Sequence, residues 1–145
     1  MSSMVDYLRQ QYYNCNYEIE QLEKQRTKCE EAYDSLVRFQ QDVSGSEGEM
    51  RSAISSREQY LAALTQAEVH CVPIQKYHSG MNDVLGGLGS RTVLRVFTWM
   101  NKHVESEKKG YMNKISEIDK EINRKRARQE ELLLEIHQAE TLEDV

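Results

Sequence analysis

Apolar residues recur in steps that alternate between four and three over two long stretches, one near each end of the chain. Such steps place side chains on one narrow stripe of a helix, and this stripe is stable in water against another helix. We call these residues seam positions. In the first stretch they are Leu8, Tyr12, Cys15, Ile19, Leu22, Arg26, Cys29, Tyr33, Leu36, Gln40 and Val43. In the second they are Leu94, Phe97, Asn101, Val104, Lys108, Tyr111, Ile115, Ile118, Ile122, Lys125, Gln129, Leu132, Ile136 and Ala139.

The pattern predicts an all-α fold, an elongated antiparallel helical hairpin or coiled coil with a shorter central helical segment. One helical domain over residues 1–145 is expected. Glycine and serine at 44–48 predict a turn after a first helix at about 3–43. A helix at about 49–70 is expected to end before Pro73, because the residue before a proline avoids helical geometry. A Gly-rich turn region at 73–90, a helix at about 91–140 and a frayed tail at 141–145 complete the prediction.

The charges along the two stretches favour antiparallel pairing. Suppose that the outermost seam positions, Leu8 and Ala139, face each other. The glutamates of Glu18–Glu23 then face the basic cluster Arg124–Arg128. The cations of Lys24–Lys28 then face the neighbourhood of Glu121 and Asp119. Flanking charges of opposite sign set the orientation and register of paired helices. This arrangement neutralises the basic cluster within the molecule, and the competing interpretation is a binding site for an anionic partner.

Composition narrows the class of protein. Charged residues make up 30% of the 145 residues and the net charge is -5, which argues against a nucleic-acid partner. The mean hydropathy is -0.75, and no run approaches the ~20 apolar residues of a membrane span. We therefore expect no membrane association. No classical leader is visible, so a cytoplasmic location is expected, with co-export beside a partner by a leaderless route as a further expectation.

Candidate chemistry is sparse. His70, Cys71 and His78 are zinc-ligand types without the usual paired spacing, so polar residues near a turn explain them better. The glycines of Gly86–Arg91 precede a helix but lack the lysine of a phosphate-binding loop. Nothing places a base beside a nucleophile. We expect no enzymatic activity, no metal and no cofactor.

The densest apolar patch in the chain opens the last predicted helix. It consists of Leu94, Val96, Phe97, Trp99 and Met100. The patch is apolar on more than one side of the helix, as expected of a helix that contacts more than one neighbour. One interpretation is the core of the protein itself, packed by Leu61, Leu64, Val84 and Leu85. The other is a partner-binding surface centred on Trp99, since Trp and Met are favoured in interface cores.

The opening helix with Tyr7-Leu8-Arg9, the central Pro73–Gly89 segment and the last helix with Tyr111–Ile122 resemble small helical proteins of the WXG superfamily. Among these, the chain is most similar to accessory proteins of LXG-domain toxins in Gram-positive type VII secretion, including the YwqH-like family. The resemblance is architectural and covers most of the chain. The chain departs from the pattern in having no Trp-x-Gly tripeptide and no aromatic residue in Thr141–Val145.

The resemblance implies a non-enzymatic targeting factor or chaperone. Such a protein binds the helical N-terminal domain of a toxin by helix packing, often beside a second small helical partner, and assists its export. The alternative is a self-associating coiled-coil scaffold or adaptor that forms a homodimer through the same seams. A third possibility is a small helical module that binds an anion or nucleic acid through Arg124–Arg128.

Overall fold

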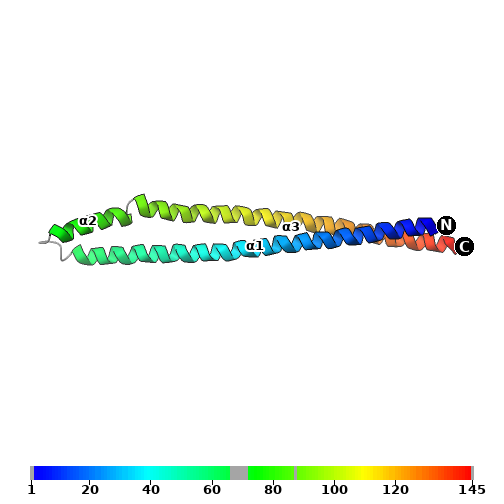
Figure 1. The fold of residues 1–145 in the computed structure, drawn as a ribbon, viewed down its shortest axis with the longest axis horizontal. Coiled ribbons are helices and arrows are strands. Elements are labelled where there is room, and N and C mark those ends of the chain that lie inside the picture. Colours follow the sequence, from blue (N-terminus) through cyan, green and yellow to red (C-terminus); the bar gives the residue numbers. More distant parts are fainter. Residues whose placement is uncertain (1, 66–71, 87, 145) are drawn as a thin grey trace. The chain divides into compact units, whose positions relative to one another are not determined.

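The computed structural model describes residues 2–65, 72–86 and 88–144. Three helices account for them: α1 (Ser2–Thr65), α2 (Val72–Gly86) and α3 (Leu88–Glu143) (Figure 1). Every described residue except Asp144 is helical, so this part of the chain contains no strand. The all-α prediction, with long helices that pair in an antiparallel hairpin and a shorter helix between them, is confirmed.

The contacts divide the chain into two compact units. Unit 1 comprises Met1–Ser35 and Lys108–Val145, and unit 2 comprises Leu36–Glu107. Each unit therefore contains a stretch of α1 and a stretch of α3, and unit 2 also contains α2.

In unit 1, the N-terminal half of α1 packs along the C-terminal part of α3 in the opposite direction (Figure 1). All seam positions of this unit are buried or half-buried. The most deeply buried of them are Leu8, Ile19, Ile122 and Leu132, and Leu132 has no exposed surface. The 4-3 spacing thus identifies the side chains that each helix hides from water, which is the main source of stability for a two-helix pair.

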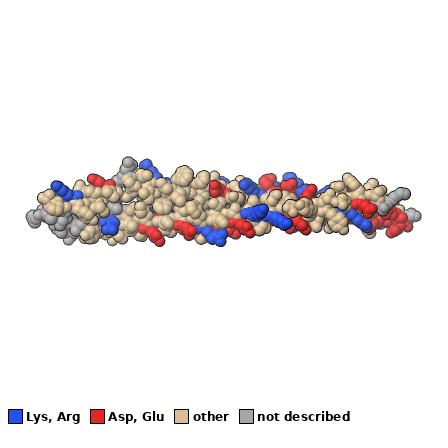
Figure 2. All heavy atoms as spheres, viewed as in Figure 1, with Lys and Arg blue, Asp and Glu red and all other residues tan. Residues whose placement is uncertain are grey.

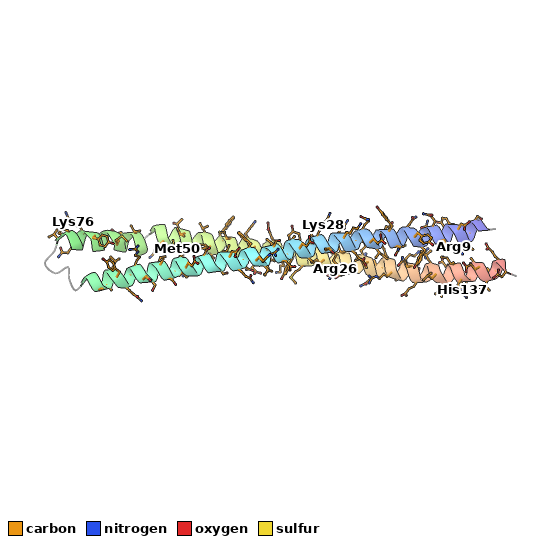
Figure 3. The ribbon with its side chains drawn as sticks, turned by 60° about the horizontal axis from the view of Figure 1, so that its bottom comes forward. Arg9, Arg26, Lys28, Met50, Lys76 and His137 are labelled. Atoms are coloured by element: carbon orange, nitrogen blue, oxygen red, sulfur yellow. The ribbon has the colours of Figure 1, made fainter. Side chains whose placement is uncertain are left out.

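Ion pairs between the helices confirm the predicted register of unit 1. Lys125 Nζ donates a hydrogen bond to Glu18, and Arg126 lies 3.0 Å from Glu23. Further along, the Arg26 guanidinium donates to both carboxylate oxygens of Asp119. Figure 3 labels Arg26 on the stretch of α1 that pairs with α3. These contacts are those expected if the two outermost seam positions face each other.

In unit 2, the rest of α1 is paired with the start of α3, and α2 runs beside the end of α1 (Figures 1 and 3). Val43, Leu61 and Val104 are buried. Gln40 Nε2 donates a 2.6 Å hydrogen bond to Glu105 Oε1 across the pair. The antiparallel pairing predicted from the sequence therefore also holds within this unit.

The turn predicted at 44–48 is not formed, because α1 continues through it to Thr65. The seam spacing continues as well, through Val43, Glu47, Met50, Ile54 and Leu61, all buried or half-buried. Each helical glycine costs about 1 kcal/mol relative to alanine. Packing along a seam that continues past the glycines outweighs that local preference for a turn.

The Gly-rich turn region predicted at 73–90 is also largely helical. Pro73 is the second residue of α2, and Gly86 is its last. A proline in the first turn is tolerated because its missing N–H has no partner there in any case. Pro73 therefore begins a helix, and the predicted end of the preceding helix near His70 lies outside the described residues. None of the described helices is both long enough and apolar enough to cross a membrane.

Candidate partner-binding site

The predicted patch at the start of α3 separates into two groups of side chains. Leu94, Phe97 and Met100 are half-buried. Val96 and Trp99 are exposed, with 50% and 64% of their surfaces accessible. Steps of three and four residues explain the separation, because only residues at those spacings share a helix face. The first group belongs to the core of unit 2 or borders it, and the second faces solvent.

The core interpretation requires Leu61, Leu64, Val84 and Leu85 to cover the patch, and not all of them are buried. Leu61 is buried, with 2% of its surface exposed, whereas 60% of Val84 is exposed. The side chains of Leu64 and Leu85 lie outside the described ones. Among described side chains, the core interpretation therefore applies to the half-buried group and leaves Val96 and Trp99 uncovered.

Trp99 lies in the middle of an exposed ridge on α3. We define the Trp99 ridge as Val93, Val96, Trp99 and His103, which follow one another in steps of three, three and four. The Trp99 indole stacks on the His103 imidazole, with ring centroids 5.4 Å apart and planes 10° from parallel. His103 was not among the predicted site residues; its spacing of four residues from Trp99 places it on the same helix face but does not specify the stacking.

His103 is in turn placed beside a carboxylate. Its Nε2 lies 3.4 Å from Glu107 Oε1, one further helical turn along α3. The indole, imidazole and carboxylate thus form a row on the surface of one helix. This row orients the indole on the helix surface while leaving one of its faces open, as suits a side chain that a partner would cover.

Other exposed apolar side chains of unit 2 lie outside α3. Those of α1 are Phe39 and Tyr60, with 45% and 54% of their surfaces exposed. Charged side chains are few along the α3 part of unit 2 in the view of Figure 2. Exposed aromatic side chains of this kind are typical of protein interaction sites.

The seam beneath the ridge contains an unsatisfied polar atom. Asn101 Oδ1 is buried and receives no hydrogen bond from the described residues. A polar side chain at a seam position lowers stability and specifies register and the number of helices in the assembly. Asn101 therefore marks a point at which unit 2 is not optimised as an isolated helix pair.

The other sequence candidates lie largely outside the described residues and side chains. His70 and Cys71 lie outside the described residues, and the side chain of His78 is not described. The described residues contain no group of three His, Cys, Asp or Glu side chains that could hold a metal ion. At the end of Gly86–Arg91, the Ser90 hydroxyl donates a 3.0 Å hydrogen bond to the Val84 carbonyl.

The basic cluster Arg124–Arg128 is largely paired within the molecule. Lys125 and Arg126 contact carboxylates of α1, and Arg128 contacts Glu131 at 3.0 Å on its own helix. Internal pairing of this kind supports neutralisation of the cluster over the anion-binding interpretation.

Comparison with known proteins identifies no relative of this chain. Searches against family models, curated proteins and solved structures find no match to the chain.

Proposed function

We propose that this chain is a non-enzymatic interaction protein that binds a helix of another protein along the Trp99 ridge. The observation that carries the proposal is the 64% exposure of Trp99 on a helix whose seam is already occupied by α1. A buried indole contributes more apolar area than almost any other side chain, and Trp is among the residues that dominate binding energy at interfaces.

A third helix is the natural cover for this surface. A helix pair uses one seam on each helix, and an additional helix packs into the surface beside that seam. Val93, Val96 and Trp99 follow helical spacing, as expected of side chains that interdigitate with those of another helix. Covering three such side chains supplies about 3–6 kcal/mol of apolar stabilisation before the entropy cost of association.

For the partner, we propose the helical N-terminal domain of an LXG-type toxin, with this chain acting as its targeting factor or chaperone in type VII secretion. The support for this step is the resemblance of Tyr7-Leu8-Arg9 and of Tyr111–Ile122 to accessory proteins of that system. An exposed apolar ridge suits the role, because long toxin helices carry apolar stripes that need cover before export.

A self-associating coiled-coil scaffold is the second candidate. It is favoured by a separate set of exposed apolar side chains in unit 1. These are Met4, Tyr7, Tyr13, Tyr17, Met112, Leu133, Leu134 and Leu142. Side chains of this kind provide contact area for a second copy of the chain, independently of the Trp99 ridge.

Coexpression tests the first candidate. The chain is produced with the N-terminal domain of an LXG toxin encoded beside it, and mass in solution is measured by light scattering. We expect a 1:1 complex. The double substitution Val96→Ala with Trp99→Ala should weaken it by about 30-fold or more, as truncation of a central interface residue does. Because both side chains are exposed, circular dichroism of the variant alone should remain helical.

Tyr17→Ala is the matched control, since 63% of Tyr17 is exposed and it lies in unit 1. It should bind as tightly as the unsubstituted chain. A complex that tolerates Val96→Ala with Trp99→Ala would refute the ridge as the site. A stable homodimer that does not bind the toxin domain would favour the self-associating scaffold instead.

A further inference from the structure

A stripe of basic residues runs along α3 beside the Trp99 ridge. We define the basic stripe as Arg91, Arg95 and Lys102, which are spaced by four and seven residues and therefore share one side of the helix. All three side chains are exposed. Trp99 follows Arg95 by four residues and precedes Lys102 by three, so the stripe and the ridge are neighbours on the helix surface.

Along α3, one carboxylate lies within four residues of this stripe: Glu105, three residues after Lys102, which accepts a hydrogen bond from Gln40. From Val84 to Val104 the chain contains no Asp or Glu, and the flanking acids are Asp83 and Glu105. Within the part of the chain that the structure describes, none of the three basic side chains forms an ion pair. Arg91 and Arg95, four residues apart, repel each other.

Unit 1 shows where the carboxylates lie when basic residues stand at a covered seam or directly beside it. Arg26, Lys125 and Arg126 each contact a carboxylate of the facing helix. Opposite charges at positions that flank an apolar seam are the usual arrangement between paired helices. By the same rule, the basic stripe lacks the facing helix that would supply its carboxylates.

We infer that the helix bound on the Trp99 ridge is acidic along the flank that faces Arg91, Arg95 and Lys102. This inference rests on the proposed function and specifies the chemistry of its partner. An amphipathic helix that covers Val96 and Trp99 with its apolar stripe places one row of flanking residues over the basic stripe. Glutamate or aspartate in that row pairs with the three cations and relieves their repulsion.

A second copy of this chain is a poor occupant of the same ridge. Antiparallel pairing of two copies through the ridge sets one basic stripe against the other. The copy's residues 84–104 contain no carboxylate, and the next two, Glu105 and Glu107, already contact Gln40 and His103. Like charges that face each other across paired helices oppose association.

Trp99 itself reports occupation of the ridge, because it is the single tryptophan of the chain. Its emission should shift to shorter wavelength when a helix shields the indole from water. The probes are three synthetic amphipathic helices of about four heptads, long enough to be helical when bound. They share one apolar stripe, lack tryptophan, and carry Glu, Gln or Lys in the flanking row.

The Glu peptide should bind the full chain about tenfold more tightly than the Gln peptide, since each exposed ion pair changes an equilibrium constant by about two- to threefold. The Lys peptide should bind most weakly. The preference of the Glu peptide should fall in ~0.5 M salt, where exposed charges are screened.

The charge-reversed chain, with Arg91→Glu, Arg95→Glu and Lys102→Glu, should invert the order and prefer the Lys peptide. Reversal of Lys109, Lys114 and Arg124 to Glu changes the net charge equally and is the control. These three cations are exposed and lie in unit 1. This control should keep the original order of peptides.

Two results separate the inference from the proposed function. Equal binding of the Glu and Gln peptides overturns the acidic partner while leaving helix docking intact. No shift of Trp99 emission with any peptide overturns helix docking itself. The acidic-helix inference is also overturned if the emission shifts with protein concentration alone as the mass doubles, or if anionic lipid vesicles cause the shift and the peptides do not.

Discussion

Arg26 and Asp119 are joined across the seam of unit 1, with the guanidinium Nε 2.6 Å from the carboxylate Oδ1. Arg26 also pairs with Glu30 one turn further along α1. A cation at a seam position is therefore held between two carboxylates, one on each helix. This arrangement fixes the register of the pair, because a shift along the seam separates Arg26 from Asp119.

Charge reversal tests this register. Arg26→Glu should lower the free energy of unfolding by about 1 kcal/mol or somewhat more, because it sets like charges together and both partners are partly exposed. Combining it with Asp119→Arg should recover part of the loss. Thermal unfolding followed by circular dichroism measures both effects, and a double variant no more stable than the sum of the single changes would contradict the pairing.

The glycines inside α1 offer a direct test of helix continuity. Gly45 and Gly48 are helical, and an added Cβ at either position meets no atom within 4 Å. Gly45→Ala and Gly48→Ala should each raise the free energy of unfolding by about 0.5–1 kcal/mol, the usual gain for alanine within a helix. A turn with positive φ at either position would reverse the sign, and denaturant unfolding distinguishes the two cases.

Leu132 and Leu134 form a matched pair for the core of unit 1. Leu132 has no exposed surface, whereas 65% of Leu134 is exposed. Leu132→Ala should destabilise the protein by about 2–4 kcal/mol through lost burial and the cavity left behind. Leu134→Ala should change stability by less than about 0.5 kcal/mol. Comparable losses at the two positions would show that the assigned seam is incorrect.

The hydrogen bond from Lys125 to Glu18 predicts a dependence of stability on alkaline pH. This bond raises the pKa of Lys125 above its ordinary value, against a smaller opposing effect of desolvation. A raised pKa in the folded chain means that the ion pair contributes fully at neutral pH. The contribution is lost as the pH rises through the raised pKa.

Lys125→Arg should keep its charge in this range and so lose less stability than the unsubstituted chain between neutral and strongly alkaline pH. Chemical unfolding at several pH values measures the difference. All other side chains are the same in the two proteins, so their effect cancels in the comparison. Identical pH profiles would show that the Lys125–Glu18 pair does not contribute to stability.

The sequence predicts the seam well because its periodicity reports burial directly. Polar seam residues such as Gln40 and Lys125 are half-buried like their apolar neighbours, since position on the helix decides burial more than residue type does. The local turn preferences of glycine and serine predicted the helix boundaries less well. The glycines and serines of 44–48 favour a turn in isolation, but Met50 and Ile54 extend the same seam and hold the segment helical.

The candidate site could be located from the sequence but not resolved into its parts. The density of apolar residues around Trp99 identified the region. Whether Phe97 or Val96 faces the neighbouring helix depends on which side of α3 that helix covers. The seam spacing contains this information for Phe97, which is half-buried, and the exposure of Val96 follows by exclusion. The stacking of His103 on Trp99 is a property of side-chain conformation that no spacing rule specifies.

The contacts of unit 1 constrain how a chain of this kind can change in length. Arg9 with Glu140 and Arg26 with Asp119 are both satisfied by one alignment of α1 with α3. Deleting a heptad from α1 alone, between Arg9 and Arg26, would make these two pairs mutually exclusive. A heptad should therefore be inserted or deleted in both helices together, at positions that face each other across the seam. Homologues would then differ in the length of the helix pair while keeping the same residue pairs across the seam.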